Sequence, residues 1–149
     1  MAQRYATATA LAAVGALGAA HPAPAQPELP DLVVLEVRAA AAGVRIGRCN
    51  AFEVLVRNAG TAAAAPTRLR LTLARPGLAQ AAVDTRTLAL AELGPGQQRV
   101  AVVSGVHVPE PGPWRIEAVA DAAQTLVESN EGNNAHALEI ASMLALCPT

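Results

Sequence analysis

The chain contains no lysine and very few aromatic residues. Its 149 residues include one Trp, one Tyr and one Phe, so the sequence lacks the several aromatic rings on which sugar-binding modules stack their ligands. All eleven positive charges are arginines, spread along the chain and matched by twelve acidic residues, for a formal net charge of -1. No basic stripe is therefore available for a phosphate backbone, and we expect no nucleic-acid partner.

A long uncharged apolar run is also missing. The longest such run, residues 6–20, is shorter than the roughly 20 residues that cross a bilayer. It follows Arg4 and is soon followed by Ala23-Pro24-Ala25, small residues of the kind that a signal peptidase recognises. We therefore predict that residues 1–25 are a cleaved export signal and that residues 26–149 are periplasmic or secreted, with no membrane span. The alternative is a buried alanine helix, which the prolines after it would end.

Cysteine is scarce too. Cys49 and Cys147 are the only two thiols, and both lie in the part of the chain that follows the predicted signal. In the oxidising compartment that export implies, an even number of cysteines tends to pair, so we predict one disulfide. Closing a loop of about 100 residues would stabilise the fold by roughly 4 to 5 kcal/mol in the chain-entropy model. The alternative is two free thiols.

The mature chain is rich in short segments with the alternating pattern of β-strands. Leu69, Leu71 and Leu73, for example, alternate with polar residues, as in a strand with one buried face. Turns rich in Gly, Pro and Asn separate seven such segments: residues 32–38, 52–57, 68–73, 87–90, 99–108, 114–120 and 135–140. The pattern predicts an all-β fold, an immunoglobulin/fibronectin III-like antiparallel β-sandwich of about seven strands, with its core in residues 30–141.

The 36 alanines bury little area each, so Val, Leu and Ile must supply most of this core. The alanine runs at residues 39–42 and 79–82 are expected to be loops. Trp114, which directly follows a proline, is expected to be a core residue on the same strand face as Ile116 and Ala118.

The order of the strands supports the disulfide. In a seven-stranded immunoglobulin-like sandwich, the start of the second strand and the end of the last strand lie at the same end of the domain. Cys49 precedes the second predicted strand, and Cys147 follows the last one. A bond between them would tie the C-terminal tail to that end of the sandwich.

Four segments resemble, in order and spacing, the CARDB domain, the cell-adhesion-related domain found in bacteria: Pro30-Asp31-Leu32-Val33-Val34, Val56 to Ala62 around Asn58-Ala59-Gly60, Leu93-Gly94-Pro95-Gly96-Gln97, and Val127-Glu128-Ser129-Asn130-Glu131-Gly132-Asn133-Asn134. The last block is the most specific. The resemblance spans roughly residues 30–140, which is nearly the whole of the predicted mature chain. It implies an immunoglobulin or fibronectin-like sandwich on secreted or surface proteins, with an adhesive or spacer role.

The densest polar cluster in the sequence runs from Asp121 to Asn134. Its oxygen-bearing side chains are of the type that calcium prefers, and the calcium candidates are Asp121, Glu128, Asn130, Glu131 and Asn133. The alternative is that these residues build a turn, because Asn and Asp side chains bind nearby backbone amides. The structural turn motif would then comprise Asn58, Gly60, Glu128, Asn130, Glu131, Asn133 and Asn134. The cluster lacks the spacing of an EF-hand loop.

No other constellation points to catalysis. His107 and His136 supply two ligands, which are too few for a transition-metal site, and both are expected to be partly exposed strand residues. No serine lies in a Gly-x-Ser-x-Gly turn. Asp121 and Glu128 resemble the carboxylate pair of a glycosidase only in type, and they already have a turn role. The sequence thus predicts no enzyme and no cofactor, and calcium stays open as the alternative for the corner from Asp121 to Asn134.

We therefore expect an exported, non-enzymatic module that binds a protein or a cell-surface component, with an adhesion-related role in the bacterial envelope. Binding would use a sheet edge or the loops at one end. Two alternatives stay open: a calcium- or metal-dependent periplasmic module that uses the corner from Asp121 to Asn134, and an accessory or inhibitor protein of an envelope enzyme.

Overall fold

The structure, a computed structural model, describes residues 24–77 and 81–148, so most of the predicted export signal lies outside the described residues. The described residues contain no helix and form seven β-strands: β1 (Leu32–Ala39), β2 (Val44–Asn58), β3 (Thr67–Ala74), β4 (Ala82–Leu90), β5 (Gln98–Val108), β6 (Gly112–Val119) and β7 (Ala135–Leu146). The predicted all-β fold is confirmed.

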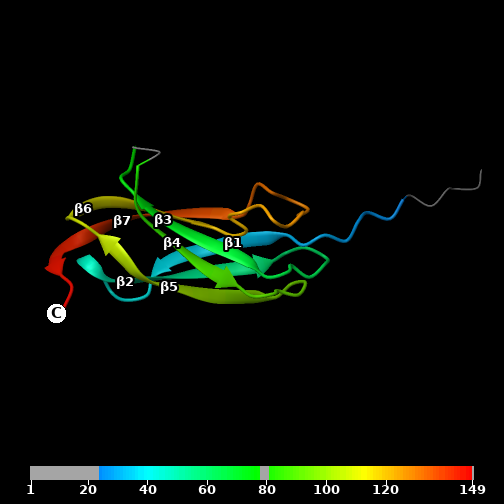
Figure 1. Cartoon of the computed structure of the whole chain (residues 1–149), viewed down its shortest axis with the longest axis horizontal. Coiled ribbons are helices and arrows are strands. Elements are labelled where there is room, and N and C mark those ends of the chain that lie inside the picture. Colours follow the sequence, from blue (N-terminus) through cyan, green and yellow to red (C-terminus); the bar gives the residue numbers. More distant parts are fainter. Residues whose placement is uncertain (1–23, 78–80, 149) are drawn as a thin grey trace, which may run out of the picture.

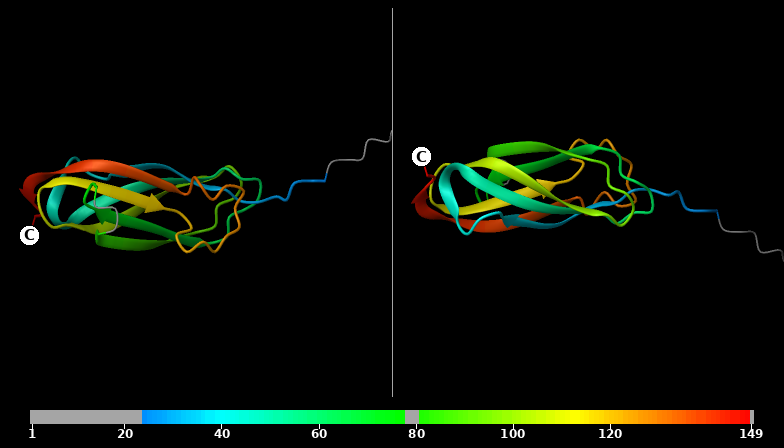
Figure 2. Two further views of the ribbon diagram at one scale, coloured as in Figure 1. Left: turned by 90° about the horizontal axis from the view of Figure 1, so that it is seen from above. Right: turned by 90° about the horizontal axis from the view of Figure 1, so that it is seen from below.

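The strands form two layers that pack face to face (Figures 1 and 2). One layer has the order β1-β2-β5 and the other has the order β4-β3-β6-β7, with antiparallel neighbours throughout both. A short parallel pairing joins the layers at one corner, where Val44 and Ile46 of β2 lie opposite Ser142 and Leu146 of β7. This parallel contact is the one departure of the described sandwich from the predicted antiparallel pairing.

The core consists of the inward-facing residues of both layers. Because successive strand residues point to opposite faces, alternate aliphatic side chains of each strand meet between the sheets. Phe52 is fully buried, and so are the three leucines of β3 that alternate with polar residues. Trp114 is also buried, together with Ile116 and Ala118, as the sequence predicts. Its indole Nε1 donates a hydrogen bond to the carbonyl of Glu110 at 3.1 Å.

The strand boundaries differ from the prediction mainly at the disulfide end. β2 begins at Val44 rather than at residue 52, so Cys49 lies inside the strand and not before it. Gly47 has a φ of 116°, and the register with β5 shifts on both sides of Asn50. This irregularity breaks the two-residue period and conceals the start of the strand. β7 likewise continues past residue 140 to Leu146.

Smaller corrections apply to the alanine runs. Ala39 is the last residue of β1, and Ala82 is the first residue of β4, which is longer than the predicted segment 87–90. Of the second run, residues 79 and 80 lie outside the described residues.

The sulfur atoms of Cys49 and Cys147 are bonded in the structure, as the sequence predicts, and their Cα atoms are 5.5 Å apart. The bond joins the first part of β2 to the residue that follows β7. Gly47 is needed beside it, because a Cβ atom at this position would lie 2.8 Å from the Sγ of Cys147.

The two ends of the described chain lie at opposite ends of the elongated sandwich (Figure 1). Residues 24–31 enter at the end where three loops cluster, and the C-terminus leaves at the disulfide end. In the described part of the chain, no helix has the length and apolar character needed to cross a bilayer.

Candidate functional site

Polar side chains gather at the end of the sandwich where the chain enters. They come from the entering segment, from the end of β2 and from the loop between β6 and β7. We call this cluster the polar corner, defined as Asp31, Asn58, Asp121, Glu128, Asn133 and Asn134. Four of these residues are buried: Asn58, Asp121, Glu128 and Asn134. Buried polar groups need hydrogen-bond partners, and here most of the partners are backbone groups of the loops.

Asn58 has no exposed surface and uses its whole side-chain amide. Its Oδ1 accepts hydrogen bonds from the N–H groups of Asp31, at 3.1 Å, and Gly60, at 3.0 Å. Its Nδ2 donates to the carbonyls of Ala62 and Leu93, both at 2.8 Å. One side chain thus fixes the entering segment and two loops relative to one another.

Gly60 packs directly against the entering segment. A Cβ atom at this position would lie 2.4 Å from the carbonyl oxygen of Leu29 and 2.6 Å from the amide nitrogen of Asp31, and neither backbone atom can yield without moving the segment. Gly60→Ala is therefore expected to lower the free energy of unfolding by about 1 to 3 kcal/mol in urea denaturation. Gly94→Ala is the control, because its nearest neighbour is the flexible Gln97 side chain at 3.3 Å. Equal losses in both variants would contradict this account of Gly60.

Asp121 closes the loop that follows β6. Its Oδ1 accepts hydrogen bonds from the hydroxyl of Thr67 at 2.5 Å and from both the N–H and the hydroxyl of Thr125, while Oδ2 accepts from the N–H of Leu126 at 2.9 Å. Its φ of 44° is a left-handed conformation that Asp and Asn tolerate better than most residues. Burial acts to raise the pKa of Asp121, but these hydrogen bonds outweigh it and hold the pKa below its ordinary value.

Glu128 reaches back across the corner to the first strand. Its Oε2 accepts a hydrogen bond from the N–H of Leu32, and its Oε1 accepts one from Nδ2 of Asn134 at 2.6 Å. Burial raises the pKa of Glu128, the two hydrogen bonds oppose this, and the nearby charges of Glu131 and Asp121 add to the rise, so the pKa lies above its ordinary value.

The remaining predicted residues make local contacts. Oδ1 of Asn130 accepts from the N–H of Gly132 at 3.0 Å, which is an Asx turn. A carboxylate oxygen of Glu131 accepts from the N–H of Glu128 at 3.0 Å, and Nδ2 of Asn133 donates to Oδ1 of Asp31 at 3.0 Å. The structure therefore brings the predicted turn residues together as hydrogen-bonding groups.

The acidic calcium candidates, Asp121, Glu128 and Glu131, do not form a metal-binding group. Among the described residues, no group of three or more His, Cys, Asp or Glu side chains is arranged to hold a metal ion. Both carboxylate oxygens of Asp121, and both of Glu128, accept hydrogen bonds from protein donors. A cation at either carboxylate would have to displace these donors.

The opposite pKa shifts of Asp121 and Glu128 predict opposite effects of pH on the stability of the fold. The pKa of Asp121 is lowered in the fold, so its stabilisation is present above the ordinary aspartate pKa and is lost as the pH falls through the folded-state pKa. The pKa of Glu128 is raised, so the protonated form contributes stability below the ordinary glutamate pKa, and that contribution is lost as the pH rises through the folded-state pKa.

Asp121→Asn keeps the shape and the backbone preference of the side chain but has one acceptor oxygen instead of two. It is expected to lower the free energy of unfolding at pH 7 by about 1 to 3 kcal/mol and to flatten the loss of stability below pH ~4. Glu128→Gln is the matched control. Its Oε1 can keep the bond from the N–H of Leu32, and its NH2 can donate to Oδ1 of Asn134 after the Asn134 amide flips, so we expect a small change at pH 7. Urea titrations from pH 3 to pH 7 measure both, and an unchanged acid limb in Asp121→Asn would contradict the assignment.

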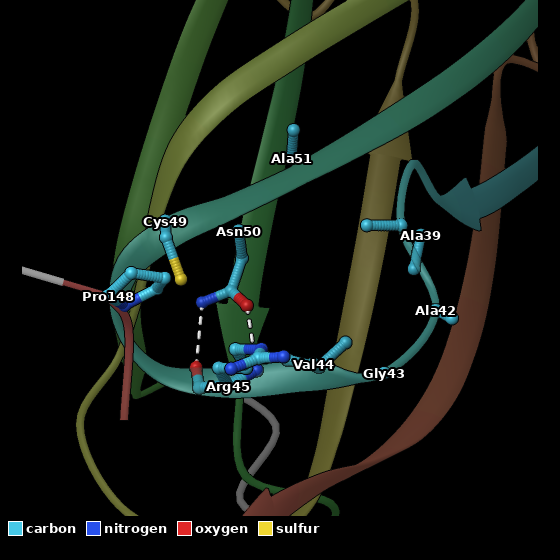
Figure 3. Close-up of a pocket in the computed structure, with 10 residues that line it drawn as sticks. Ala39, Ala42, Gly43, Val44, Arg45, Cys49, Asn50, Ala51 and Pro148 are labelled. Atoms are coloured by element: carbon cyan, nitrogen blue, oxygen red, sulfur yellow. Dashed lines mark hydrogen bonds between the residues drawn. The ribbon is translucent and has the colours of Figure 1, made fainter. Parts of the chain in front are cut away.

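A second candidate site lies at the disulfide end. A hollow of about 280 Å³ is lined by the loop between β1 and β2, by Cys49 and Asn50, and by Pro148 (Figure 3). Half of the residues that line it are alanine or glycine. The buried side chain of Asn50 bonds to the N–H and the carbonyl of Arg45, both at 2.8 Å, and to two further carbonyls. Its polar atoms are thus engaged, and Arg45 is the one charged residue among those that line the hollow.

A charged clamp between the two layers was not predicted from the sequence. Oδ2 of Asp84 accepts from Nε of Arg86 at 3.1 Å and from the N–H of His107 at 2.7 Å, and Nη2 of Arg86 donates to the carbonyl of Gly105 at 2.7 Å. Burial acts to raise the pKa of Asp84, but the hydrogen bonds outweigh it and the pKa lies below its ordinary value. The clamp joins the edge strands β4 and β5, which do not pair through their backbones. The two histidines considered as metal ligands are both half-buried. His107 lies on β5 and His136 lies on β7, and these strands belong to different layers.

Comparison with known proteins identifies the family of this domain. The family model named CARDB matches residues 29–138, which include the strands from β1 to the first part of β7 and the whole polar corner. The chain belongs to the CARDB family. The resemblance inferred from the four sequence segments is thereby confirmed.

Solved CARDB structures have the same fold. The CARDB domain of a Pyrococcus furiosus protein, solved in complex with di-metal ions, is 26% identical, with a TM-score of 0.60 over 82% of this chain and 99% of that chain. A solution structure of that domain is 28% identical, with a TM-score of 0.60 over 79% and 99%. A domain of a putative cell surface protein from Methanosarcina acetivorans is 19% identical, with a TM-score of 0.56 over 79% and 96%, which shows the fold alone. No curated protein matches the chain.

Proposed function

We propose that this CARDB domain is exported and acts without catalysis, by presenting its surface to a protein or another cell-surface component, as an adhesive or spacer module of the envelope. The observation that carries the proposal is the use of the polar corner. The buried carboxylates of Asp121 and Glu128 accept hydrogen bonds from protein donors and hold loops in place. They are structural groups rather than a pair of carboxylates facing a substrate.

Two further observations support an extracytoplasmic role. Residues 1–25 have the features of an export signal, and the disulfide is of the kind that persists in oxidising compartments.

Export is tested with a reporter. Residues 1–25 are fused to an alkaline phosphatase that lacks its own signal and folds only where disulfides form. We expect phosphatase activity in intact cells, and we expect it to disappear when residues 6–20 are deleted, because the apolar run is what the export machinery binds. Activity confined to lysed cells would overturn the export part of the proposal.

Surface presentation is tested on whole cells. Full-length protein with a photo-crosslinking residue at exposed Val127, in the loops of the polar corner, is compared with protein carrying it at exposed Val100 on the outer face of β5. A single crosslinked partner obtained from one position and not the other would support a specific surface. Crosslinking to no envelope component from either position would count against an interaction role. An envelope enzyme as the partner would identify the module as an accessory or inhibitor protein.

Metal dependence is the second candidate, because the Pyrococcus furiosus relative was solved with di-metal ions. In this chain the carboxylates that would serve calcium are already bound by protein donors. We therefore expect neither EDTA nor millimolar calcium to move the melting temperature by more than about 1 °C, far less than a bound stabilising ligand produces. Calorimetric titration with calcium checks the same point. A saturable binding isotherm that is lost in Asp121→Asn would establish the metal-dependent function instead.

A further inference from the structure

We propose that the fold resists tension applied between the segment that enters β1 and Pro148, and that the disulfide confines the loaded part of the chain to β1 and the adjoining stretch of β2. The biological role rests on the proposed function, since only a module held at the cell surface is pulled. The mechanical property itself is a feature of the isolated domain.

The disulfide sets the path of the load at the C-terminal end. The bond joins two residues that are 98 positions apart, and Cys147 is almost the last described residue. Tension applied beyond Pro148 therefore passes through the sulfur atoms directly into β2. The strands β3 to β7 lie inside the closed loop, so they are bypassed and cannot be extended while the bond is intact.

At the other end the load enters β1. Its pairing with β2 runs from Leu32 opposite Asn58 to Ala39 opposite Phe52. The entering chain pulls β1 outward from the Leu32 end, whereas Cys49 pulls β2 outward beyond the Phe52 end. The two strands are thus pulled in opposite directions along their axes.

This direction of pull is the resistant one. Hydrogen bonds of an antiparallel pair stand perpendicular to the strands, so tension along the axes loads them all together instead of opening them one at a time. Figures 1 and 2 show the two strands running side by side along the length of the sandwich.

The polar corner reinforces the point where the load enters. The N–H of Asp31 donates to Asn58, and the N–H of Leu32 donates to Glu128. The carbonyl of Leu29 accepts from the N–H of Thr61 at 2.9 Å, and the carbonyl of Pro30 accepts from the N–H of Ser129 at 2.9 Å. These bonds hold the segment that carries the tension into β1, which assigns a mechanical use to the buried polar groups.

The test is single-molecule force extension of the full chain with a cysteine-free tag at each end. In the oxidised protein, rupture releases only the chain up to Cys49. In the Cys49→Ser/Cys147→Ser variant, or after reduction, rupture also releases the 98-residue loop. The lengthening on rupture is expected to be greater by about 330 Å, at about 3.4 Å per residue. Equal lengthening in the two forms would overturn the proposal.

Paired variants then test which strand carries the load. Val37→Ala removes a buried side chain of β1, and Val83→Ala makes the same chemical change at an exposed position of β4, inside the closed loop. In the oxidised protein we expect Val37→Ala to lower the mean rupture force and Val83→Ala to leave it unchanged. Equal loss of force in both would overturn the assignment of the load to β1. Export and crosslinking are measured separately in cells, so a failure of the proposed function is distinguishable from a failure of this mechanical proposal.

Discussion

Asn58→Asp is expected to lower the free energy of unfolding by more than about 3 kcal/mol, although it changes the side chain by a single group. The NH2 that donates to the carbonyls of Ala62 and Leu93 becomes a carboxylate oxygen. Each carbonyl then loses its donor, at about 1 to 3 kcal/mol apiece, and a charge with no cationic partner is placed where the side chain has no exposed surface. Urea denaturation at pH 7 measures the loss.

Asn130→Asp is the matched control for this prediction. Asn130 is exposed and uses only its Oδ1, which accepts from the N–H of Gly132, and an aspartate keeps that acceptor. We expect a change within about 0.5 kcal/mol, as for most surface substitutions. If Asn58→Asp costs no more than Asn130→Asp, the central position of Asn58 in the polar corner is wrong.

The second large effect is expected from removal of the disulfide. Cys49→Ser/Cys147→Ser frees a loop of 98 residues in the unfolded chain, which in the chain-entropy model costs roughly 4 to 5 kcal/mol of stability. That is a large fraction of the total for a small domain. Reversible urea denaturation of the two proteins, without reductant, gives the difference.

Reduction provides the control for the disulfide variant. A reducing agent should lower the stability of the natural chain to that of the double serine variant, and it should leave the variant itself unchanged. A natural chain whose stability does not respond to reduction would contradict the contribution assigned to the bond.

The sequence predicts most strands of this fold well because the alternation of apolar and polar residues is visible locally. Alternation in β3 is visible over six residues, and Leu69, Leu71 and Leu73 are all buried, as expected. The start of β2 escapes the same reasoning because Gly47 and the bulge next to it interrupt the period. The parallel contact between β2 and β7 is equally hidden, since register between distant strands has no trace in local periodicity.

The polar corner is predictable in its composition but not in its contacts. The block from Glu128 to Asn134 indicates a turn, and the structure places it as one. The partners of its buried groups are far away in the sequence: the N–H of Leu32 lies 96 residues before Glu128, and the hydroxyl of Thr67 lies 54 residues before Asp121. Nothing in the pattern of the sequence couples these positions. The clamp of Asp84, Arg86 and His107 was missed for the same reason.

Exposed aliphatic side chains are candidate contacts for a partner. Val100 and Val102, each about half exposed, lie on the outer face of β5. Single exposed aliphatic residues are ordinary on protein surfaces, so their meaning depends on a bound partner and not on their number. This is why the crosslinking experiment compares that face with the loops of the polar corner.

We propose that the chain is exported, trimmed and oxidised before it works. The intact mass of the protein isolated from the cells that produce it tests all three points at once. We predict a protein that lacks residues 1–25, that is two hydrogens lighter than its reduced form because of one disulfide between Cys49 and Cys147, and that takes two alkylations per chain only after reduction. A chain that retains residues 1–25 and carries two free thiols would contradict the account.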